Sequence, residues 1–308
     1  MLMRCERGAS LALNTAESAE VSAEVSSMTS ITALRSPAEL KAWRVKHRHK
    51  RVGFVPTMGA LHQGHLSLVR LAQAHADVTL ASVFVNPAQF NRAEDLEAYP
   101  VDVEGDIAQL SAVGCDAVFI PSAHDIYPQG AQTQVSVGSL AEHLCGATRP
   151  GHFEGVCTVV SLLFNLTQCD VAVFGEKDYQ QLAIIRQMVR DLHFPVEVIG
   201  APTARASDGL ALSSRNLRLS DEDRALAPAL YRGLLKAQAG WSDGVRDPAE
   251  LKALTLNELP ASFRVDYLEL CHPARLSPLS AGHQAREALL AVAVFLGEVR
   301  LIDNLTLR

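Results

Sequence analysis

The 308-residue sequence lacks any apolar run long enough to cross a membrane. The longest apolar stretch, Leu289 to Gly297, is far shorter than the roughly 18 residues that a membrane-spanning helix needs, and we interpret it as a buried strand. An excess of basic residues is also missing, because 28 Lys and Arg stand against 34 Asp and Glu and give a net charge of −6. This balance argues against broad electrostatic binding of nucleic acid. The sequence therefore predicts neither a membrane nor a nucleic-acid partner.

Cysteines are few, and none forms a Cys-x-x-Cys pair. The six cysteines are Cys5, Cys115, Cys145, Cys157, Cys169 and Cys271. Nothing indicates secretion, because the first 27 residues are rich in Ala, Ser and Glu and have neither the apolar core of a signal peptide nor the arginine-rich face of a transit peptide. We therefore expect reduced, buried thiols without zinc, a cytoplasmic protein, and a disordered leader over residues 1–27.

The most informative segment contains His62 and His65, between an apolar predicted strand (52–55) and an amphipathic predicted helix (66–76). A helix N-terminus carries unpaired N–H groups and a partial positive charge, so it attracts phosphate oxygens. Gly59 and Gly64 allow the backbone to approach a ligand, and two imidazoles can donate hydrogen bonds to charge that develops on a phosphate. The segment indicates nucleotide chemistry, although the two histidines alone would also suit ordinary polar side chains at a helix start.

Short apolar segments alternate with helical patterns through the first two thirds of the chain. Further strands are predicted at 78–85, 117–120, 170–174 and 196–199, and a helix after residue 178 should bury Leu182, Ile185, Val189 and Leu192. A further helix should start at Ser36, with Pro37 in its first turn and Glu39 completing a capping box. This alternation predicts an α/β protein with a Rossmann-like, doubly wound parallel sheet over residues 28–203.

The pattern changes after residue 204. A helical region precedes predicted strands at 264–270 and 289–299, which indicates a smaller α+β domain over residues 204–308. We expect a hinge near residues 202–208, so that this domain acts as a lid.

The segment GFVPTMGALHQGH at 53–65 closely resembles the signature of the pantothenate synthetase (pantoate–β-alanine ligase) family, in the His-x-Gly-His nucleotidyl-transfer superfamily. Other segments resemble the motifs of that family in the same order: FVNPAQF at 84–90, RPGHF at 149–153, FGEKDYQQ at 174–181, DGLALSSRN at 208–216 and RLIDN at 300–304. The resemblance runs from about Met28 to the C-terminus.

The resemblance implies an AMP-forming ligase that uses ATP and Mg²⁺ to join pantoate to β-alanine through a pantoyl-adenylate, and it implies a homodimer. The catalytic residues that it implies are His62, His65, Lys177 and Arg215, with His65 as proton donor. The implied ATP-binding residues are Met58, Gly59, Ala60, Leu61, His62, Gln63, Gly64, His65, Gly175, Glu176, Lys177, Asp178, Ala204, Leu212, Ser213, Ser214 and Arg215. Gln89 and Gln181 match the pair that binds pantoate, Gln89 also lies near the β-alanine site, and Asp106 matches a candidate Mg²⁺ ligand.

The implied chemistry is consistent with these side chains. A carboxylate is anionic near pH 7, so its attack on the α-phosphorus of ATP needs charge neutralisation and positioning rather than a general base. The second step requires a deprotonated amine, and we expect its rate to rise with pH as the amine and a histidine titrate.

Plainer interpretations exist for several of these residues. Lys177 could be a solvated lysine at a helix start, and residues 213–216 could be a helix cap. Only one of Gln180 and Gln181 can point into a site, and we predict that it is Gln181. Arg149 and His152 could shape the substrate side or brace a loop.

Other functions are compatible with part of the pattern. A different nucleotidyltransferase of the superfamily would lack a second acceptor site, a class I aminoacyl-tRNA synthetase would need a tRNA-binding appendage, and a nucleotide sensor would bind ATP without turnover.

Some positions depart from the family pattern. Val101 and Asp102 stand where the family has Arg-Thr, and Leu162 stands where a lysine is common. Cys169 stands where a proline is common, and Ala204 stands where the family has a valine. None of these departures affects the histidine pair, Gln89, Lys177 or Gln181.

Overall fold

The computed structural model describes residues 31–91 and 93–308 and contains a six-stranded and a three-stranded sheet. The predicted leader lies outside the described residues. The strands are β1 (Thr32–Leu34), β2 (Val52–Thr57), β3 (Val78–Val83), β4 (Ala117–Phe119), β5 (Val171–Gly175), β6 (Glu197–Ala201), β7 (Phe263–Cys271), β8 (Ala288–Leu296) and β9 (Val299–Leu307). The α-helices are α1 (Pro37–Lys46), α2 (Gln63–His75), α3 (Ala93–Glu97), α4 (Val103–Ala112), α5 (Ala123–Ile126), α6 (Cys145–Thr148), α7 (His152–Thr167), α8 (Tyr179–Asp191), α9 (Asp221–Leu226), α10 (Ala229–Ser242) and α11 (Pro248–Leu256). Short 3₁₀ turns are η1 (Pro87–Gln89), η2 (Ser139–Ala141), η3 (Glu176–Asp178) and η4 (Ser214–Arg218).

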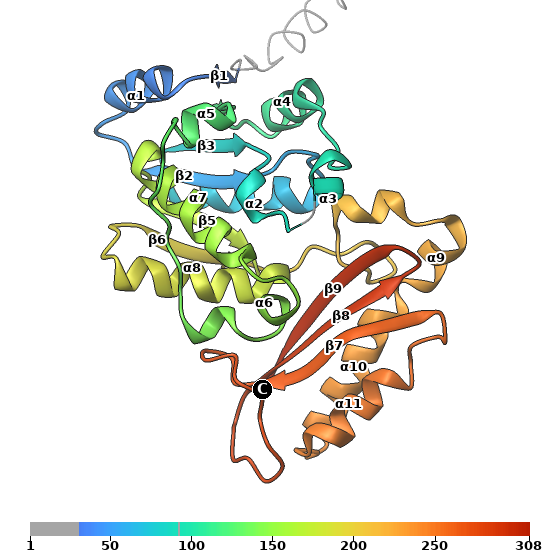
Figure 1. Ribbon diagram of the computed structural model, residues 1–308. Coiled ribbons are helices and arrows are strands. Elements are labelled where there is room, and N and C mark those ends of the chain that lie inside the picture. Colours follow the sequence, from blue (N-terminus) through green and yellow to red (C-terminus); the bar gives the residue numbers. More distant parts are fainter. Residues whose placement is uncertain (1–30, 92) are drawn as a thin grey trace, which may run out of the picture.

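The six-stranded sheet is parallel and has the order β1-β4-β3-β2-β5-β6 (Figure 1). From β2 the chain moves through β3 to β4 on one side, and it later returns to place β5 and β6 on the other side. The switch point therefore lies between β2 and β5, where open α/β sheets bind their ligands. The predicted doubly wound parallel sheet is confirmed.

Both faces of this sheet are covered, because neighbouring residues of each central strand enter different cores. In β2, Phe54 packs with the helices α1, α7 and α8, whereas Val55 packs with α2 and α4 on the opposite face. In β5, Ala172 packs in the same core as Phe54, and Val173 packs in the same core as Val55. Burial on two faces explains why these strands are apolar throughout rather than alternating.

Helix α1 begins as the capping signals predict. The Oγ of Ser36 accepts the N–H of Glu39 at 3.2 Å, and Pro37 occupies the first turn. The Glu39 carboxylate accepts the N–H of Arg35 rather than that of Ser36.

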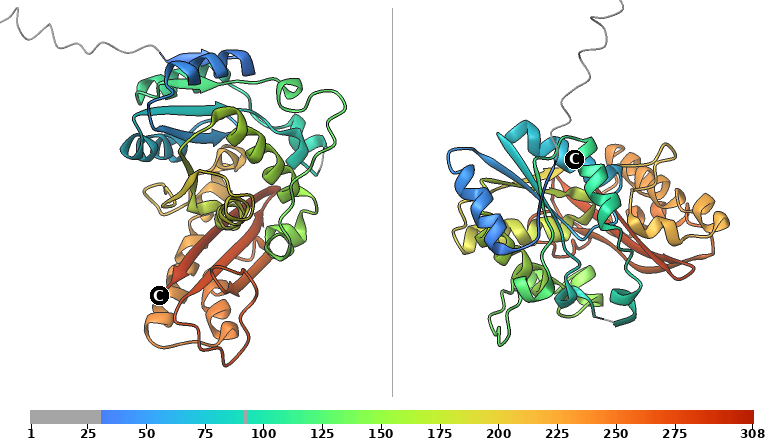
Figure 2. Two further views of the ribbon diagram at one scale, coloured as in Figure 1. Left: turned by 90° about the vertical axis from the view of Figure 1, so that its left-hand side faces the viewer. Right: turned by 90° about the horizontal axis from the view of Figure 1, so that it is seen from above.

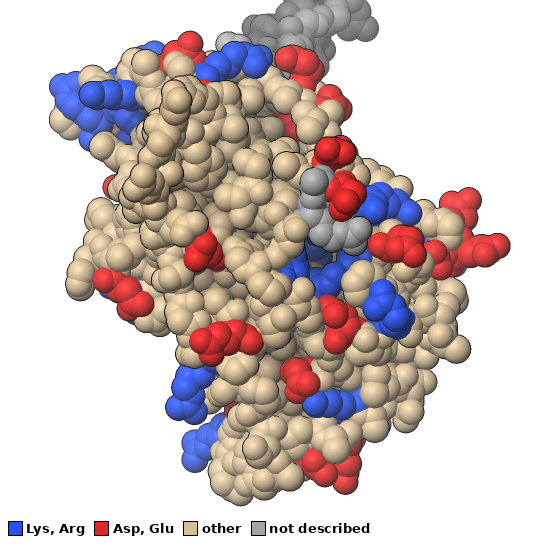
Figure 3. Space-filling model, in the orientation of Figure 1, with Lys and Arg blue, Asp and Glu red and all other residues tan. Residues whose placement is uncertain are grey.

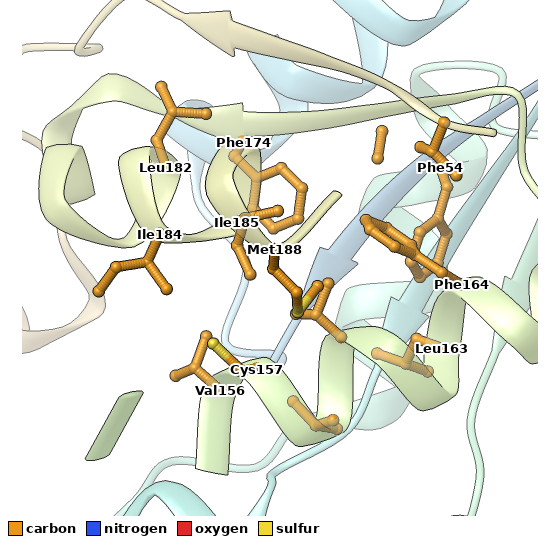
Figure 4. Packing of buried hydrophobic residues seen from close by; sticks show 14 of the residues in the cluster. Phe54, Val156, Cys157, Leu163, Phe164, Phe174, Leu182, Ile184, Ile185 and Met188 are labelled. Carbon is orange, nitrogen blue, oxygen red and sulfur yellow. The ribbon is translucent and has the colours of Figure 1, made fainter. Parts of the chain in front are cut away.

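Helix α8 packs its apolar side chains against α7 and β5 (Figure 4). Leu182 and Ile185 are buried as predicted, and Val189 packs against the same core. The prediction for Leu192 is wrong, because the helix ends at Asp191 and the Leu192 side chain is 50% exposed. Two residues of α8 that were not predicted to be buried, Ile184 and Met188, are buried.

The second sheet is antiparallel, with the order β7-β8-β9. Leu290 and Val292 of β8 face the core formed with α10 and α11, whereas Leu289 and Ala291 face the core of the parallel-sheet part. The strand predicted at 289–299 is shorter than expected, because the chain turns after Leu296 and continues as β9, which the sequence pattern did not predict as a strand. Figure 2 shows this sheet beside the parallel-sheet part, with α10 and α11 on its far side.

Candidate active site

The His-x-Gly-His segment forms the turn from β2 into α2 at the switch point. Gly59 and Ala60 both have left-handed backbone conformations, with φ of 84° and 50°. A Cβ at residue 59 would lie 2.8 Å from an Asp106 carboxylate oxygen, so only glycine fits this position. The left-handed conformations of Gly59 and Ala60 thus turn the chain so that His62 becomes the N-cap residue of α2.

The two imidazoles cap the helix that follows them. His62 is the N-cap residue, and its Nδ1 accepts the N–H of Gly64 at 3.1 Å. The Nδ1 of His65 accepts the N–H of His62 at 3.3 Å. Because each Nδ1 is an acceptor, the proton of each neutral ring resides on Nε2. A backbone N–H at the N-terminus of α2 thus fixes the orientation of each ring. The Nε2–H of each ring remains as a donor for another group.

Both histidines are neutral at ordinary pH. Burial, followed by the positive charge of Lys177, lowers the pKa of His62 from 6.5 to about 4. Burial and then the neighbouring His62 and Lys177 lower the pKa of His65 to about 3. The ring centroids lie 4.1 Å apart, a distance at which two imidazolium charges would repel strongly. We expected the rate of the second step to rise with pH partly because a histidine titrates. The low pKa values of both rings contradict this part of the expectation, because neither ring changes its charge near neutral pH.

Asp106, on α4, holds the turn. One carboxylate oxygen accepts the N–H of Ala60 at 3.0 Å and the other accepts that of Leu61 at 2.8 Å. The residue is 1% exposed, and burial raises its pKa despite these hydrogen bonds. Among residues 31–91 and 93–308, no group of three or more His, Cys, Asp or Glu side chains could hold a metal ion. The two hydrogen bonds give Asp106 a positioning role in the turn, and its predicted role as Mg²⁺ ligand stays a prediction.

Gln89 occupies η1, beyond the end of β3, and a network of polar groups fixes its amide. Its Oε1 accepts from Asn86 Nδ2 at 3.0 Å, and its Nε2 contacts the sulfur of Met58 at 3.1 Å. Asn86 is 1% exposed and itself accepts from the hydroxyl of Tyr127 at 2.8 Å. The N–H face of the Gln89 amide is therefore directed toward the turn that carries the histidines.

Arg149 and His152 brace the loop that carries Gln89, which is one of the two roles considered for them, and their role toward the substrate stays a prediction. The backbone carbonyl of Gln89 accepts from His152 Nδ1 at 2.8 Å, and His152 Nε2 contacts an Arg149 guanidinium nitrogen at 3.1 Å. Burial, followed by the charge of Arg149, lowers the pKa of His152 to about 4. The pair braces Gln89, and both residues also line the cavities described below.

Lys177 lies in η3, directly after β5, and Gln180 and Gln181 begin α8. Gln180 is 6% exposed and is fully engaged, because its amide N donates to the carbonyls of Leu140 and His143 and its Oε1 accepts the N–H of Cys145. Gln181 instead lines both cavities. Gln180 also lines the larger cavity, although its amide is occupied by these backbone groups, whereas only Gln181 lines the histidine cavity described below as well. The choice of Gln181 as the residue that binds substrate stays a prediction.

Residues 202–215 complete the site. The carbonyl of Ala204 accepts the N–H of Leu212 at 2.9 Å, which holds two predicted ATP-binding residues side by side. The Oγ of Ser213 accepts the N–H of Arg215 at 3.3 Å and caps η4, so the plain helix-cap interpretation is correct for Ser213. Ser214 is hydrogen-bonded to the side chain of the half-buried Tyr99.

Two adjoining cavities bring these segments together. The first, which we call the histidine cavity, is about 240 Å³ in volume. It is lined by His62, His65, Gln89, Lys177, Gln181, Ala204, Leu212, Ser213, Ser214 and Arg215, together with an apolar wall of Val156, Val159, Val160, Leu163 and Phe174. The second, the larger cavity of about 330 Å³, lies between the two sheets and shares Lys177, Asp178, Gln181 and residues 213–215 with the first. Basic side chains line a hollow in the molecular surface (Figure 3).

The sequence pattern did not identify all residues of the cavities. Tyr99 and the apolar wall from α7 were absent from the predicted site. Motifs of polar residues do not indicate these apolar side chains. The signal that could have identified those of α7 is the apolar character of residues 153–164 on every face, which is typical of a helix that is buried on all sides.

Of the departures from the family pattern, Leu162 packs against the core, and Val101 is 67% exposed.

The five described cysteines are buried and free, as predicted for them. No helix in the described ranges is both long and apolar enough to span a membrane.

Comparisons with known proteins show which family the chain resembles in sequence and fold. A sequence profile of the family described as pantoate-beta-alanine ligase matches residues 29–306. Pantothenate synthetase of Pseudomonas fluorescens (strain Pf0-1) is 51% identical over 267 residues, which cover 86% of this chain and 93% of that protein. The crystal structure of pantothenate synthetase from Thermus thermophilus is 49% identical and has a TM-score of 0.84, with 89% of this chain and 99% of that chain covered. A pantoate-beta-alanine ligase from Francisella tularensis, complexed with beta-gamma ATP and beta-alanine, is 34% identical and has a TM-score of 0.75 over 89% of this chain and 97% of that chain.

Proposed function

Because the chain belongs to the pantoate–β-alanine ligase family, we propose that its histidine cavity is where pantoate is activated by ATP and then joined to β-alanine. The protein is a ligase that catalyses the ATP-dependent condensation of pantoate with β-alanine. The proposal concerns how its residues do so: through a pantoyl-adenylate, with release of pyrophosphate and then AMP.

A single observation carries the proposed mechanism, namely the paired, neutral imidazoles whose Nδ1 atoms are both occupied by backbone N–H groups. Each ring then has an Nε2–H as its remaining donor, fixed in orientation before any substrate binds. Fixed donors that face developing negative charge stabilise a transition state without reorganisation. His62 and His65 thus serve as hydrogen-bond donors to the phosphates of ATP.

In the first step, a carboxylate oxygen of pantoate attacks the α-phosphorus and the bond to the leaving pyrophosphate breaks. Negative charge accumulates on the phosphate oxygens, and Lys177 and Arg215 supply the compensating positive charge at the cavity wall. The backbone of residues 58–65, residues 175–178 and the segment from Ala204 to Ser214 hold the nucleotide. Gln89 and Gln181 bind pantoate, with the amide orientation of Gln89 fixed by Asn86.

In the second step, the neutral amine of β-alanine attacks the acyl carbon, AMP leaves with the former carboxylate oxygen, and the amine loses a proton. In the unliganded protein the pKa values of the histidines are lowered to about 4 and about 3, so the amine of β-alanine is the group that we expect to titrate near neutral pH in this step. His152, whose Nδ1 donates to the carbonyl of Gln89, lines both cavities, and we propose that the amine reaches Gln89 from the larger cavity.

The shape of the histidine cavity supports pantoate as the acid. Pantoate has polar groups at both ends and a carbon with two methyl groups between them. Val156, Val159 and Val160 line the same cavity as Gln89 and provide apolar surface for these methyl groups. A dinucleotide-forming nucleotidyltransferase would have no use for this combination of paired amides and an apolar wall.

We further propose that Mg²⁺ enters with ATP, as part of the substrate. Mg²⁺ is commonly bound by one or two carboxylates together with substrate phosphates rather than by a protein cage, and the carboxylate of Asp106 is already bound by two backbone N–H groups. Bound Mg²⁺ would neutralise part of the phosphate charge. The proposal also includes a homodimer, a cytoplasmic location, and a boundary at residues 203–204 between a nucleotide-binding domain and a lid domain.

An isotope experiment tests the proposed intermediate. Pantoate labelled with a heavy oxygen isotope in its carboxylate is incubated with the protein, ATP, Mg²⁺ and β-alanine, and AMP is analysed by mass spectrometry. A pantoyl-adenylate predicts that labelled oxygen appears in AMP. Unlabelled AMP, or the formation of ADP, would exclude this route.

A further inference from the structure

The turn that carries Lys177 is held from the second sheet. The side-chain amide nitrogen of Asn304, on β9, donates to the carbonyl of Glu176 at 3.0 Å and to that of Lys177 at 2.9 Å. Asn304 is 8% exposed, and its two N–H groups are directed at two successive carbonyls. Since η3 is a short 3₁₀ turn, these two bonds restrain the backbone from which the Lys177 side chain extends.

The residue before Asn304 restrains a different segment of the site. Asp303 forms a two-pronged ion pair with Arg205, with nitrogen–oxygen distances of 2.6 and 2.9 Å, and its side chain is 1% exposed. Arg205 also donates to the carbonyl of Gly209 and stacks on the ring of Tyr231 at 3.6 Å. This pair fixes the chain immediately after Ala204. One carboxylate oxygen of Asp303 additionally accepts the N–H of Asn304, which links the two restraints.

We infer that Asn304 is a positioning residue for the adenylation step, acting through Lys177. The inference rests on the proposed role of Lys177 toward the phosphates of ATP. Asn304 itself contacts the backbone of η3, and it lies more than 120 residues from Lys177 in sequence. The second sheet therefore takes part in the chemistry of a cavity whose histidines and glutamines all belong to the parallel-sheet part.

The physical reason lies in the precision that phosphate transfer requires. A lysine ammonium stabilises the transition state only if it lies close to the oxygens that gain charge, and its flexible side chain does not by itself ensure this. A fixed Lys177 backbone narrows the volume that the ammonium can sample. Loss of the two bonds should reduce the rate of the chemical step more than the affinity for pantoate.

The test is a double-mutant cycle between Asn304 and Lys177. Asn304→Leu keeps a similar volume and removes both donors, whereas Asn304→Asp places a carboxylate against two carbonyl oxygens. Each is made in the wild-type chain and in Lys177→Ala, and pantoate-dependent ATP–pyrophosphate exchange is measured. Lys252→Met serves as control, because it removes one ion pair of the second sheet, with Glu269, away from η3. Thermal unfolding of each variant shows that it is folded, and Asn304→Ser, which keeps one donor, replaces any variant that is not.

The inference predicts that Asn304→Leu lowers kcat for exchange by roughly tenfold with KM for pantoate changed less than about twofold. Asn304→Asp should be slower still, and Lys252→Met should match the wild type. In the Lys177→Ala chain, Asn304→Leu should cost less than about a further twofold, because the group that it positions is gone.

Two results would overturn the inference and have different meanings. If Lys177→Ala is slow but Asn304→Leu is normal, or if the loss from Asn304→Leu is the same with and without Lys177, the positioning role is wrong and the proposed function stands. If Lys177→Ala itself exchanges at the wild-type rate, the role proposed for Lys177 is wrong and the inference fails with it.

Discussion

His62 carries two separable functions on the two nitrogens of one ring, and isosteric substitutions can divide them. Its Nδ1 accepts the N–H of Gly64 at 3.1 Å and caps α2, whereas its Nε2–H is the proposed donor to ATP. The oxygen of an asparagine side chain can occupy the place of Nδ1, and the amide nitrogen of a glutamine can reach the place of Nε2. We therefore expect His62→Asn to keep the cap and lose the donor, and His62→Gln to show the reverse.

The magnitudes follow from the two contacts. Removal of an N-cap acceptor costs about 1 kcal/mol in the free energy of unfolding, and asparagine is among the best N-cap residues. Removal of one fixed donor to developing charge typically slows a reaction by roughly 100- to 1,000-fold. His62→Ala should show both losses, His62→Asn should be as stable as the wild type but slow, and His62→Gln should be less stable but faster than His62→Asn.

The assay combines urea unfolding with the rate of pantoate-dependent ATP–pyrophosphate exchange at saturating ATP. The reasoning is refuted if His62→Asn exchanges within about threefold of the wild-type rate, since the Nε2 donor would then contribute little. It is refuted equally if His62→Ala unfolds at the wild-type urea concentration, since the capping contact would then have no energetic value.

Other consequences follow from buried groups. Gln180→Leu should lose a few kcal/mol in the free energy of unfolding, because it leaves two carbonyls and an N–H without partners. Gln181→Ala should unfold like the wild type and raise KM for pantoate; the reverse assignment of losses between the two glutamines would contradict their placement. Asp303→Asn should cost about 3–5 kcal/mol, because it leaves the Arg205 guanidinium without its buried counter-ion, and a much smaller loss in denaturant unfolding would contradict this. The lowered pKa of His65 means that the unfolded chain binds a proton between about pH 6.5 and 3 that the folded chain does not, so stability should fall as pH drops through this window, by up to about 1.4 kcal/mol per pH unit. His65→Gln should lose stability less steeply there, and equal slopes for the two proteins would contradict the low pKa.

The parts of the site that the sequence predicts well are those made by local structure. The turn after β2 depends on nearby glycines, a predicted strand and a helix start, so the positions of His62 and His65 follow from the segment itself. Local structure also predicts that only one of Gln180 and Gln181 enters the site, because neighbouring residues on a helix point in different directions, whereas the choice of Gln181 rests on the resemblance.

The contacts that hold these groups could not be read in this way. Asp106 reaches Leu61 across 45 residues, and Asn304 reaches Lys177 across 127. The resemblance includes both positions, Asp106 as a candidate Mg²⁺ ligand and Asn304 within RLIDN, but only the packing of distant elements reveals which backbone groups their side chains bind. For the same reason Leu192 matched the pattern of a core residue, since its periodicity continues beyond the point where α8 ends.

The central claim, that pantoate is activated by ATP in the absence of the amine, is tested most directly by ATP–pyrophosphate exchange. The protein is incubated with ATP, Mg²⁺ and labelled pyrophosphate, with and without pantoate, and β-alanine is omitted. The account predicts that label enters ATP only when pantoate is present, and that addition of β-alanine then releases AMP. Folded protein that binds ATP but shows no pantoate-dependent exchange would contradict it.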